Sequence, residues 1–233
     1  MEFKYLLAIC IVCILIVIGY LYINYKSDSI VNIDPVIKQC GERFDLERVY
    51  EFDDLLTEKE CEMLIERAKP LVKRSDVSSE EKYDDIRTSS HVFLPSDDWL
   101  TKKIDKIVYD QLKIPVENYE DLQVVNYKPT QKYDEHWDAC IHGDVCEQEL
   151  KDIGSYRYAT FIIYLNDVFD GGSTNFPKKN KKVVPKRGKG VLFFNLNDTL
   201  DDVRENSIHA GMPILSGEKW MCNKWIRLKP IKK

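Results

Sequence analysis

The longest hydrophobic run of the chain lies near its start, where the nineteen residues 5–23 carry no charge. As a helix this run would be about 28 Å long, close to the thickness of the hydrocarbon core of a bilayer. Tyr20, Tyr22 and Tyr25 stand at its end, where amphipathic rings suit the lipid headgroups. We therefore predict one transmembrane helix within residues 1–25, retained as an anchor. A cleaved signal peptide fits less well, because no Ala-x-Ala-like exit follows, and a buried core helix is the third alternative.

Two amphipathic helices are predicted after a polar stalk over residues 26–43. Thr57 and Glu60 have the spacing of a capping box, and the helix that they introduce should end near Pro70. A second helix should begin at Ser96 and stop at Pro115. We interpret their apolar stripes as core contacts. The stripes are Cys61, Leu64, Ile65 and Ala68 in the first helix, and Leu100, Ile104, Ile107, Val108 and Leu112 in the second.

Short runs rich in β-branched and aromatic residues follow residue 119, with turns such as Asp170-Gly171-Gly172 between them. Several short strands separated by glycine and proline predict an antiparallel sandwich or barrel. The predicted strands are residues 121–127, 156–166, 190–195 and 219–228. We therefore predict a single α+β domain over residues 44–233, with helices first and a β-sandwich after them.

The charge of the chain is nearly balanced, with 39 acidic and 34 basic side chains and a net charge of −5. A nucleic-acid-binding domain is usually strongly basic, so we predict no nucleic-acid partner. Residues 178–189 nevertheless contain seven basic side chains. We interpret this segment as a solvated hairpin, and binding to anionic lipid or an acidic substrate is the alternative. Residues 75–86 are polar and indicate a solvated loop, or else a lid over a site.

The cysteines and one sequon favour a compartment outside the cytoplasm. Cys140 and Cys146 are close enough in sequence to form a disulfide where conditions are oxidising. Asn197 begins an Asn-x-Thr glycosylation sequon, which is used only in a secretory lumen. Lys4 and Lys26 flank the predicted span almost symmetrically, so the positive-inside rule does not orient it. We expect a single-pass membrane protein whose folded domain is luminal, as in the endoplasmic reticulum, or otherwise extracytoplasmic.

Two His-x-Asp pairs are candidates for binding a metal ion, at residues 136–138 and 142–144. On a strand, residues i and i+2 face the same side, so the imidazole and the carboxylate can share one ion. The second pair contains a glycine and lies in an acidic, cysteine-bearing segment that indicates a loop. We therefore favour His136 and Asp138, and we interpret His91, in a predicted strand, as structural.

An Fe(II) oxygenase site needs two histidines and one carboxylate on one face of the metal, with three positions left for co-substrate and O₂. His209 is the candidate for the third ligand. Lys219 follows ten residues later and could pair with the far carboxylate of a dicarboxylate co-substrate. A buried carboxylate requires such a counter-charge. The residues thus support the hypothesis of an iron site beside an anion site.

From Arg87 to Arg227 the chain resembles the 2-oxoglutarate- and Fe(II)-dependent prolyl 4-hydroxylases, especially their compact plant, algal or viral type. The resemblance implies an α+β fold with a double-stranded β-helix (jelly-roll) core and supporting N-terminal helices. Thr130 replaces the glycine of the family's Tyr-x-Pro-Gly turn, so we expect a different backbone there. The matching motifs are RTS (87–89), LQVVNYKPTQKYDEHWD (122–138), RYATFIIYLND (157–167), GGSTNFP (171–177), VPKRGKGVLFFN (184–195), HAGMPILSGEKW (209–220) and NKWIR (223–227).

The resemblance also implies roles for individual residues. Trp225 would form a wall of the site, whereas the tyrosines of the co-substrate pocket have core packing as an alternative role. The implied iron ligands are His136, Asp138 and His209. The implied contacts of 2-oxoglutarate are Lys219, Tyr127, Tyr164 and Thr174.

The activity implied by the resemblance is the 4-hydroxylation of peptidyl proline, with 2-oxoglutarate and O₂ consumed and succinate and CO₂ released. L-ascorbate as a reductant and a proline-rich or collagen-like peptide as substrate are expectations of the same kind. Such a peptide would bind as an extended polyproline II chain, with residues 75–86 and 139–155 as candidate covers. The alternatives are the same chemistry on another residue such as lysine, and a non-catalytic, membrane-anchored binding module on this fold.

Overall fold

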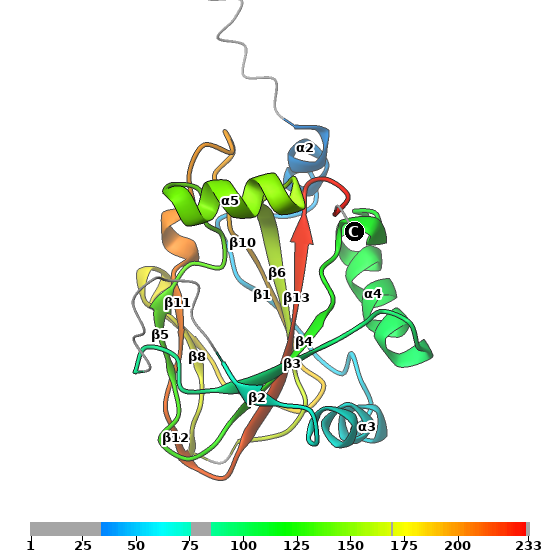
Figure 1. Cartoon of the computed structure of the whole chain (residues 1–233), viewed down its shortest axis with the longest axis vertical. Helices are drawn as coiled ribbons and strands as arrows, with labels where there is room; N and C mark the ends of the chain where they lie inside the picture. The colour runs from blue at the N-terminus through cyan, green and yellow to red at the C-terminus, as the bar shows by residue number, and fades with distance from the viewer. Residues whose placement is uncertain (1–33, 76–84, 169, 232–233) are drawn as a thin grey trace, which may run out of the picture. The chain divides into compact units, whose positions relative to one another are not determined.

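Two antiparallel sheets form the centre of the computed structural model, which describes residues 34–75, 85–168 and 170–231 (Figure 1). The larger sheet has seven strands in the order β1-β10-β6-β13-β4-β3-β2, and the smaller has four in the order β5-β11-β8-β9. The larger sheet contains β1 (Tyr50–Phe52), β2 (Lys73–Arg74), β3 (Ser90–Leu94), β4 (Leu122–Tyr127), β6 (Arg157–Tyr164), β10 (Gly190–Phe194) and β13 (Lys219–Arg227). The smaller contains β5 (Tyr133–His136), β8 (Thr174–Phe176), β9 (Lys181–Val183) and β11 (His209–Gly211), and β7 (Asp170–Gly171) pairs with β12 (Ile214–Ser216).

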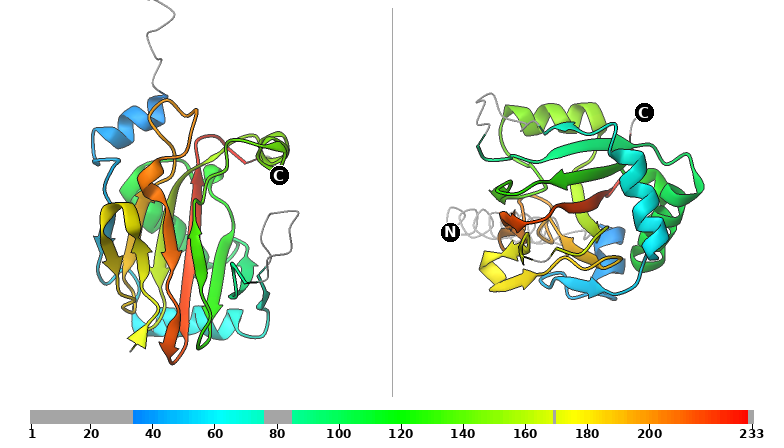
Figure 2. Two further views of the ribbon diagram at one scale, coloured as in Figure 1. Left: turned by 90° about the vertical axis from the view of Figure 1, so that its left-hand side faces the viewer. Right: turned by 90° about the horizontal axis from the view of Figure 1, so that it is seen from below.

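The larger sheet is covered on both faces, by helices on one and by the smaller sheet on the other (Figure 2). Leu122 and Val124 of β4 belong to the core shared with the helices, whereas Val125 and Tyr127 belong to the core between the sheets. Burial on both faces explains why these strands are continuous hydrophobic runs in the sequence. The helices are α2 (Pro35–Gly41), α3 (Glu58–Ala68), α4 (Trp99–Leu112) and α5 (Asp144–Ile153), with 3₁₀ turns η1 (Val116–Asn118), η2 (Pro177–Lys179) and η3 (Glu205–Ser207).

The predicted strands are confirmed as β4, β6, β10 and β13, and the first predicted helix is confirmed as α3. Both hydrogen bonds of the capping box between Thr57 and Glu60 are present. The second helix begins at Trp99, later than predicted, because Asp98 and not Ser96 caps it. The Asp98 carboxylate accepts hydrogen bonds from two backbone N–H groups of the first turn. The two sheets and their supporting helices thus agree with the predicted α+β sandwich.

Two predicted boundaries are wrong. Residues 35–41, which we predicted in the stalk, form α2, and its Ile37 and Cys40 are buried in the core beside the larger sheet. The compact unit therefore begins at Val36 rather than at residue 44. Residues 144–153, which we predicted as a loop, form α5. Cys146 is the only buried residue of this helix, although Cys146, Leu150 and Ile153 follow one another at helical spacing in the sequence.

The turn before β5 has an unusual backbone conformation. Thr130 adopts φ of 70°, the left-handed conformation for which glycine is favoured. The Thr130 N–H donates to the Ile214 carbonyl at 2.8 Å, which ties the turn to β12. The side chain is exposed and tolerated, although the conformation is costly for a β-branched residue.

None of the helices within the described ranges has the length and the hydrophobicity needed to cross a bilayer. The transmembrane helix that we predicted over residues 5–23 lies outside the described residues, as do residues 76–84 of the predicted loop. Cys140 and Cys146 form the disulfide that their spacing allowed. The other described cysteines, Cys40, Cys61 and Cys222, are free and buried.

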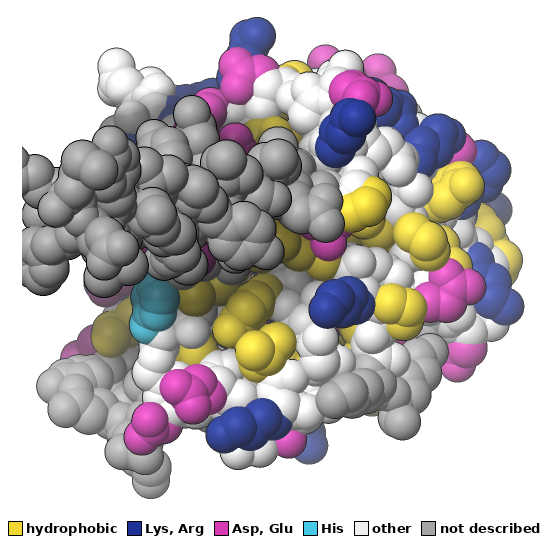
Figure 3. Space-filling view, turned by 90° about the horizontal axis from the view of Figure 1, so that it is seen from above, with side chains coloured by type: hydrophobic (Ala, Val, Ile, Leu, Met, Phe, Trp, Pro, Cys, Tyr) yellow, Lys and Arg dark blue, Asp and Glu magenta, His cyan; other side chains and the backbone are white. Residues whose placement is uncertain are grey.

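The basic segment over residues 178–189 forms ion pairs with neighbouring acidic side chains. Lys178 lies 2.9 Å from Glu205, and Lys181 and Lys189 lie 2.9 and 2.8 Å from the two carboxylate oxygens of Glu51. Basic and acidic side chains are also interspersed on the face of the molecule seen from above (Figure 3). The structure therefore favours the solvated hairpin over a surface that binds anions.

Candidate active site

Three predicted metal ligands converge between β5 and β11. These strands pair so that His136 and His209 lie directly opposite each other, and Asp138 follows two residues after His136. One ligand atom from each residue lies within 4.8 Å of the other two. The Nε2 atoms of His136 and His209 are each 3.7 Å from a different oxygen of Asp138. Strand pairing thus brings together side chains that are separated by more than seventy positions in the sequence.

Backbone carbonyls orient both imidazoles. Nδ1 of His136 lies 2.8 Å from the Asp134 carbonyl oxygen, and Nδ1 of His209 lies 3.0 Å from that of Ser207. A carbonyl only accepts, so each Nδ1 carries a proton and donates, which leaves the Nε2 lone pair for a metal. Burial lowers the pKa of His209 to about 4, so its ring is neutral near pH 7.

Hydrogen bonds from neighbouring strands position the carboxylate of Asp138. Thr160 on β6 donates from its hydroxyl to Oδ2 at 2.7 Å, and the amide of Asn195 donates to the same hydroxyl at 2.9 Å. Burial alone would raise the pKa of Asp138, but His209, His136 and the Thr160 hydrogen bond lower it well below its usual range. The carboxylate is therefore ionised and ready to bind a cation. Thr160 and Asn195 were not predicted as site residues, since nothing in their local sequence distinguishes them.

The predicted anion site is formed by a buried lysine among tyrosines. Lys219 begins β13 opposite Tyr127 of β4, is only 1% exposed, and donates to the Gly172 carbonyl at 2.8 Å. Its Nζ lies 5.1 Å from the ring centre of Tyr127 and 5.6 Å from that of Tyr164. The Tyr164 hydroxyl donates to Thr174 Oγ1 at 2.7 Å. Burial lowers the pKa of Lys219 to about 7, and a bound carboxylate would restore its charge.

One cavity of about 500 Å³ joins the anion site to the metal ligands. Alternate residues of β13 line it from one end to the other, namely Lys219, Met221, Asn223 and Trp225. Tyr127 and Thr174 line it as predicted, whereas Tyr164 lies outside the lining and reaches it through Thr174. The buried cation and the metal ligands thus face one continuous cavity.

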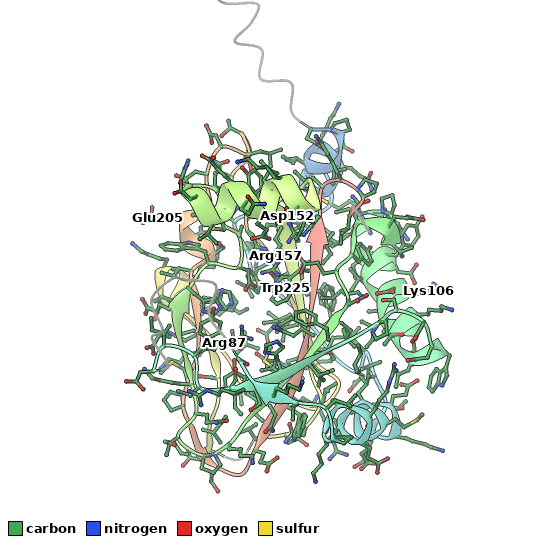
Figure 4. All side chains as sticks on the ribbon, in the orientation of Figure 1. Arg87, Lys106, Asp152, Arg157, Glu205 and Trp225 are labelled. Atoms are coloured by element: carbon green, nitrogen blue, oxygen red, sulfur yellow. A yellow bond between two sulfur atoms is a disulfide. The ribbon has the colours of Figure 1, made fainter. Side chains whose placement is uncertain are left out.

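The same cavity is also lined by Arg157, Trp225 and Arg87. Arg157 and Trp225 lie next to each other, and Arg87 lies apart from them (Figure 4). The Arg157 guanidinium lies 3.7 Å from the Trp225 ring centre, and both oxygens of Glu120 accept from it at 2.7 and 2.8 Å. The Arg87 guanidinium covers the ring of Tyr133 at 4.8 Å. The position of Trp225 agrees with its predicted role as a wall. Arg157 and Glu120 were missed, because their pairing is visible only in the folded chain.

His142 and Asn197 lie away from this cavity, whereas His91 lines it. His142 of the second His-x-Asp pair is exposed and lies 3.7 Å from Asp202, so it takes no part in the metal site. His91 has its Nδ1 2.9 Å from the Ser75 hydroxyl. Asn197 of the sequon donates to Asp201 at 2.7 Å in an exposed loop.

The donor set fits Fe(II). Two imidazole nitrogens and one carboxylate oxygen are the ligand set typical of non-haem iron oxygenases, and three such ligands would leave positions on the ion free for co-substrate and O₂. The buried cation at the other end of the cavity fits the second carboxylate of 2-oxoglutarate.

Comparison with known proteins supports this assignment. The family described as the 2OG-Fe(II) oxygenase superfamily matches residues 122–227. A putative prolyl 4-hydroxylase of Acanthamoeba polyphaga mimivirus is 34% identical over 206 residues, which cover 88% of this chain and 81% of that protein. Prolyl 4-hydroxylase 2 of Arabidopsis thaliana is 35% identical over 230 residues, with 87% and 73% covered.

A solved structure shows the same fold. The viral collagen prolyl hydroxylase of Paramecium Bursaria Chlorella virus-1, in complex with 2-oxoglutarate, superimposes with a TM-score of 0.63 at 29% identity. The match covers 77% of this chain and 95% of the viral protein. From the identity to its relatives and the residues that converge in its cavity, we conclude that this chain belongs to the prolyl 4-hydroxylase family of 2-oxoglutarate- and Fe(II)-dependent oxygenases.

Proposed function

We propose that this protein hydroxylates peptidyl proline at C4, with 2-oxoglutarate and O₂ consumed and succinate and CO₂ released. The observation that carries the proposal is a single cavity with the ligand set His136, Asp138 and His209 in its middle and Lys219 at one end. Fe(II), when bound, supplies the activation of O₂ that side chains cannot perform. The protein orients the reactants and excludes water from them.

The residues of the cavity divide this work between them. Lys219 holds the far carboxylate of 2-oxoglutarate, with Thr174 and Tyr127 beside it and Tyr164 behind Thr174. His136, Asp138 and His209 hold the metal, and Thr160 keeps the Asp138 carboxylate in place. The aromatic wall beyond them suits a polyproline II peptide. Trp225 presents an indole N–H that has no hydrogen-bond partner among the described residues, so it could donate to a peptide carbonyl.

Proline is favoured as the target because two relatives that match most of the chain are named as prolyl 4-hydroxylases. The viral neighbour is described as a collagen prolyl hydroxylase. A proline-rich or collagen-like peptide is therefore the proposed substrate, and L-ascorbate is the proposed reductant that returns iron to Fe(II).

A peptide panel with proline-rich, collagen-like and lysine-containing members tests the proposal. We expect a mass gain of one oxygen atom on proline, dependent on Fe(II) and 2-oxoglutarate and matched by succinate release. His136→Ala and His209→Ala should lose both signals, while the exposed variant His142→Ala keeps them. Oxidation of lysine alone, or of no peptide, would contradict the assignment.

We also propose that residues 5–23 anchor the protein in a membrane with the folded domain in the secretory lumen. The uncharged run, the disulfide and the exposed sequon at Asn197 support this placement. Expression in a eukaryotic cell should yield a glycan on Asn197 that Asn197→Gln removes, seen as a mobility shift after endoglycosidase treatment. A chain without the glycan and with a reduced Cys140–Cys146 pair would contradict a luminal domain.

A further inference from the structure

Helix α5 is held to the rest of the domain by few contacts. It has ten residues, of which only Cys146 is buried, and Gly143 at its N-terminus provides no side-chain cap. A helix this short is marginal by itself in water. It therefore depends on its attachments, and Cys146 provides a covalent one through its disulfide to Cys140.

The second attachment of α5 is an ion pair that the domain can lose at low cost. Glu149 lies 2.5 Å from the Arg227 guanidinium. Arg227 also contacts Glu120 at 2.6 Å, so it remains paired when Glu149 moves away. Glu149 is one-third exposed, so water can solvate its carboxylate when the helix moves, whereas a disulfide cannot separate without a chemical reaction. The disulfide is thus the main restraint on the position of α5.

This helix forms a wall of the cavity that holds the metal ligands. Val145 and Glu149 of α5 line the cavity, as does Cys140, which lies two residues after Asp138. Val145 is 43% exposed, and two further lining side chains, Phe93 and Trp137, are 45% and 41% exposed. Exposed apolar side chains around the opening of a site indicate a surface that a partner covers. Because this surface is continuous with the active site, its occupant is the peptide on either side of the target residue.

We propose that the Cys140–Cys146 disulfide is a positioning element, which fixes α5 as a wall of the peptide groove and makes peptide binding sensitive to reduction. This inference rests on the proposed peptide hydroxylation and concerns how reduction of the disulfide would regulate that activity. An external dithiol would break the S–S bond by thiolate attack and exchange. Two cysteine thiols form, the dithiol becomes a disulfide, and two electrons and two protons pass to the protein. Re-oxidation by a disulfide oxidant reverses the step.

The opposite end of the cavity should be unaffected. Lys219, Thr174 and Tyr127 belong to β13, β8 and β4, which are held by the sheets and not by the disulfide. Reduction should therefore weaken the binding of peptide and spare that of 2-oxoglutarate. This separation distinguishes a positioning role from a general loss of stability.

The test compares the full chain in detergent before and after treatment with dithiothreitol, which is then removed without oxygen. Alkylation followed by mass spectrometry counts the two thiols gained. We expect the KM for a proline-rich peptide to rise about five- to tenfold, since only the fraction of molecules with α5 in place binds well. The kcat and the KM for 2-oxoglutarate should stay within about twofold, and hydrogen exchange should increase in α5 alone.

Variants provide the matched controls. The double variant Cys140→Ser/Cys146→Ser should resemble the reduced protein and should no longer respond to dithiothreitol. Val145→Ser, which keeps the disulfide, should also raise the peptide KM. Gln148→Ala changes an exposed residue of α5 that bonds only within the helix, to Asp152, and should have no effect. Reduction of the folded wild-type protein tests the inference even if the double variant folds poorly.

The outcomes separate the two proposals. If oxidised protein hydroxylates the peptide and reduction leaves its KM unchanged, the positioning role is wrong while the proposed activity stands. An equal rise in both KM values would also overturn it, because that result indicates general loosening. If the oxidised protein hydroxylates no peptide, the proposed function fails, and this inference fails with it.

Discussion

The carboxylate of Asp138 owes its position to a hydroxyl from a different strand. Thr160 donates to Oδ2, and its own oxygen accepts from Asn195, so the orientation of the ligand depends on a chain of two hydrogen bonds. Groups that orient a metal ligand usually affect metal affinity about 10- to 100-fold. Thr160 is therefore the side chain outside the ligand set from which we expect the largest effect on iron.

Replacing Thr160 by valine keeps the shape of the side chain and removes its hydrogen bond to Asp138. We expect Fe(II) affinity to fall about tenfold, with a matching increase in the iron concentration needed for half-maximal turnover. Anaerobic titration with Fe(II) or Co(II) measures the affinity. Thr160→Ser should restore most of it, and an unchanged affinity in Thr160→Val would show that the hydroxyl does not position the ligand.

The buried ammonium of Lys219 should make 2-oxoglutarate binding depend on pH. Its pKa, about 7 because of burial, compares with about 10.4 for an exposed lysine. Binding a carboxylate favours the charged form, so the pKa in the complex is higher than in the free protein. Affinity should therefore be greatest below pH 7 and fall about tenfold per pH unit above it, until the pKa of the complex is reached.

Calorimetric titration of 2-oxoglutarate between pH 6 and 9, with a metal ion present, checks this dependence. Lys219→Arg is the matched control, because a guanidinium keeps its charge over this range. Its affinity should be lower overall but flat between pH 7 and 9. A flat profile in the wild-type protein would show that Lys219 remains charged without its partner.

For individual residues, the sequence allowed the metal ligands and the buried cation to be predicted. His136, Asp138, His209 and Lys219 carry rare or chemically distinct side chains at recognisable spacings, so each could be predicted. Thr160, Asn195 and Glu120 could not, because common residues acquire a role only from the neighbours that folding supplies.

The elements that were predicted are those buried over most of their length. β4, β6, β10 and β13 stand out as hydrophobic runs, and α3 and α4 as apolar stripes. The four strands of the smaller sheet have only three or four residues each and include polar side chains, so they leave no pattern. α5 was missed although Cys146, Leu150 and Ile153 have helical spacing, because the segment is short and mostly polar and only Cys146 is buried.

The turn between β7 and β8 connects backbone conformation to the anion site. Gly172 has φ of 65°, and its carbonyl accepts from Lys219. A Cβ at this position would lie 2.5 Å from the Ile214 Cδ1 and 3.6 Å from the Lys219 side chain. Gly172→Ala should therefore cost about 1–2 kcal/mol of stability and raise the KM for 2-oxoglutarate several-fold.

Gly217→Ala is the control for this prediction. Gly217 has φ of 81°, but a Cβ there meets nothing within 4 Å. The variant should lose a similar amount of stability, measured by chemical denaturation, and keep the KM for 2-oxoglutarate. Equal KM values for Gly172→Ala and the wild-type protein would show that the turn does not position Lys219.

For the whole molecule, the distribution of charge bears on how it meets a membrane. Three lysines of residues 178–189, Lys178, Lys181 and Lys189, pair with Glu51 or Glu205, which reduces the positive charge that this segment presents to a membrane. Any attachment to lipid should then come from the hydrophobic run over residues 5–23.

Vesicle flotation of the full chain and of a fragment over residues 34–233 tests this expectation. We expect the full chain to float with neutral and with anionic vesicles alike, because burial of apolar surface does not depend on lipid charge. The fragment should remain unbound to both. Binding of the fragment to anionic vesicles that salt abolishes would indicate that the basic segment is a lipid-binding surface after all.

Alternate residues of strand β13 face the cavity and the hydrophobic core. Its odd-numbered residues from Lys219 to Trp225 all face the cavity, while Cys222 and Ile226 belong to the hydrophobic core behind it. Deleting one residue within the strand would turn every following side chain to the opposite face of the sheet. Residues that now face the cavity would then point into the core, and core residues would point into the cavity. A single strand therefore sets the distance from Lys219 to Trp225. This distance is six residues, or about 20 Å of extended backbone. Substitutions along β13 can therefore change the side chains that face the cavity, whereas insertions or deletions within the strand would disrupt the site.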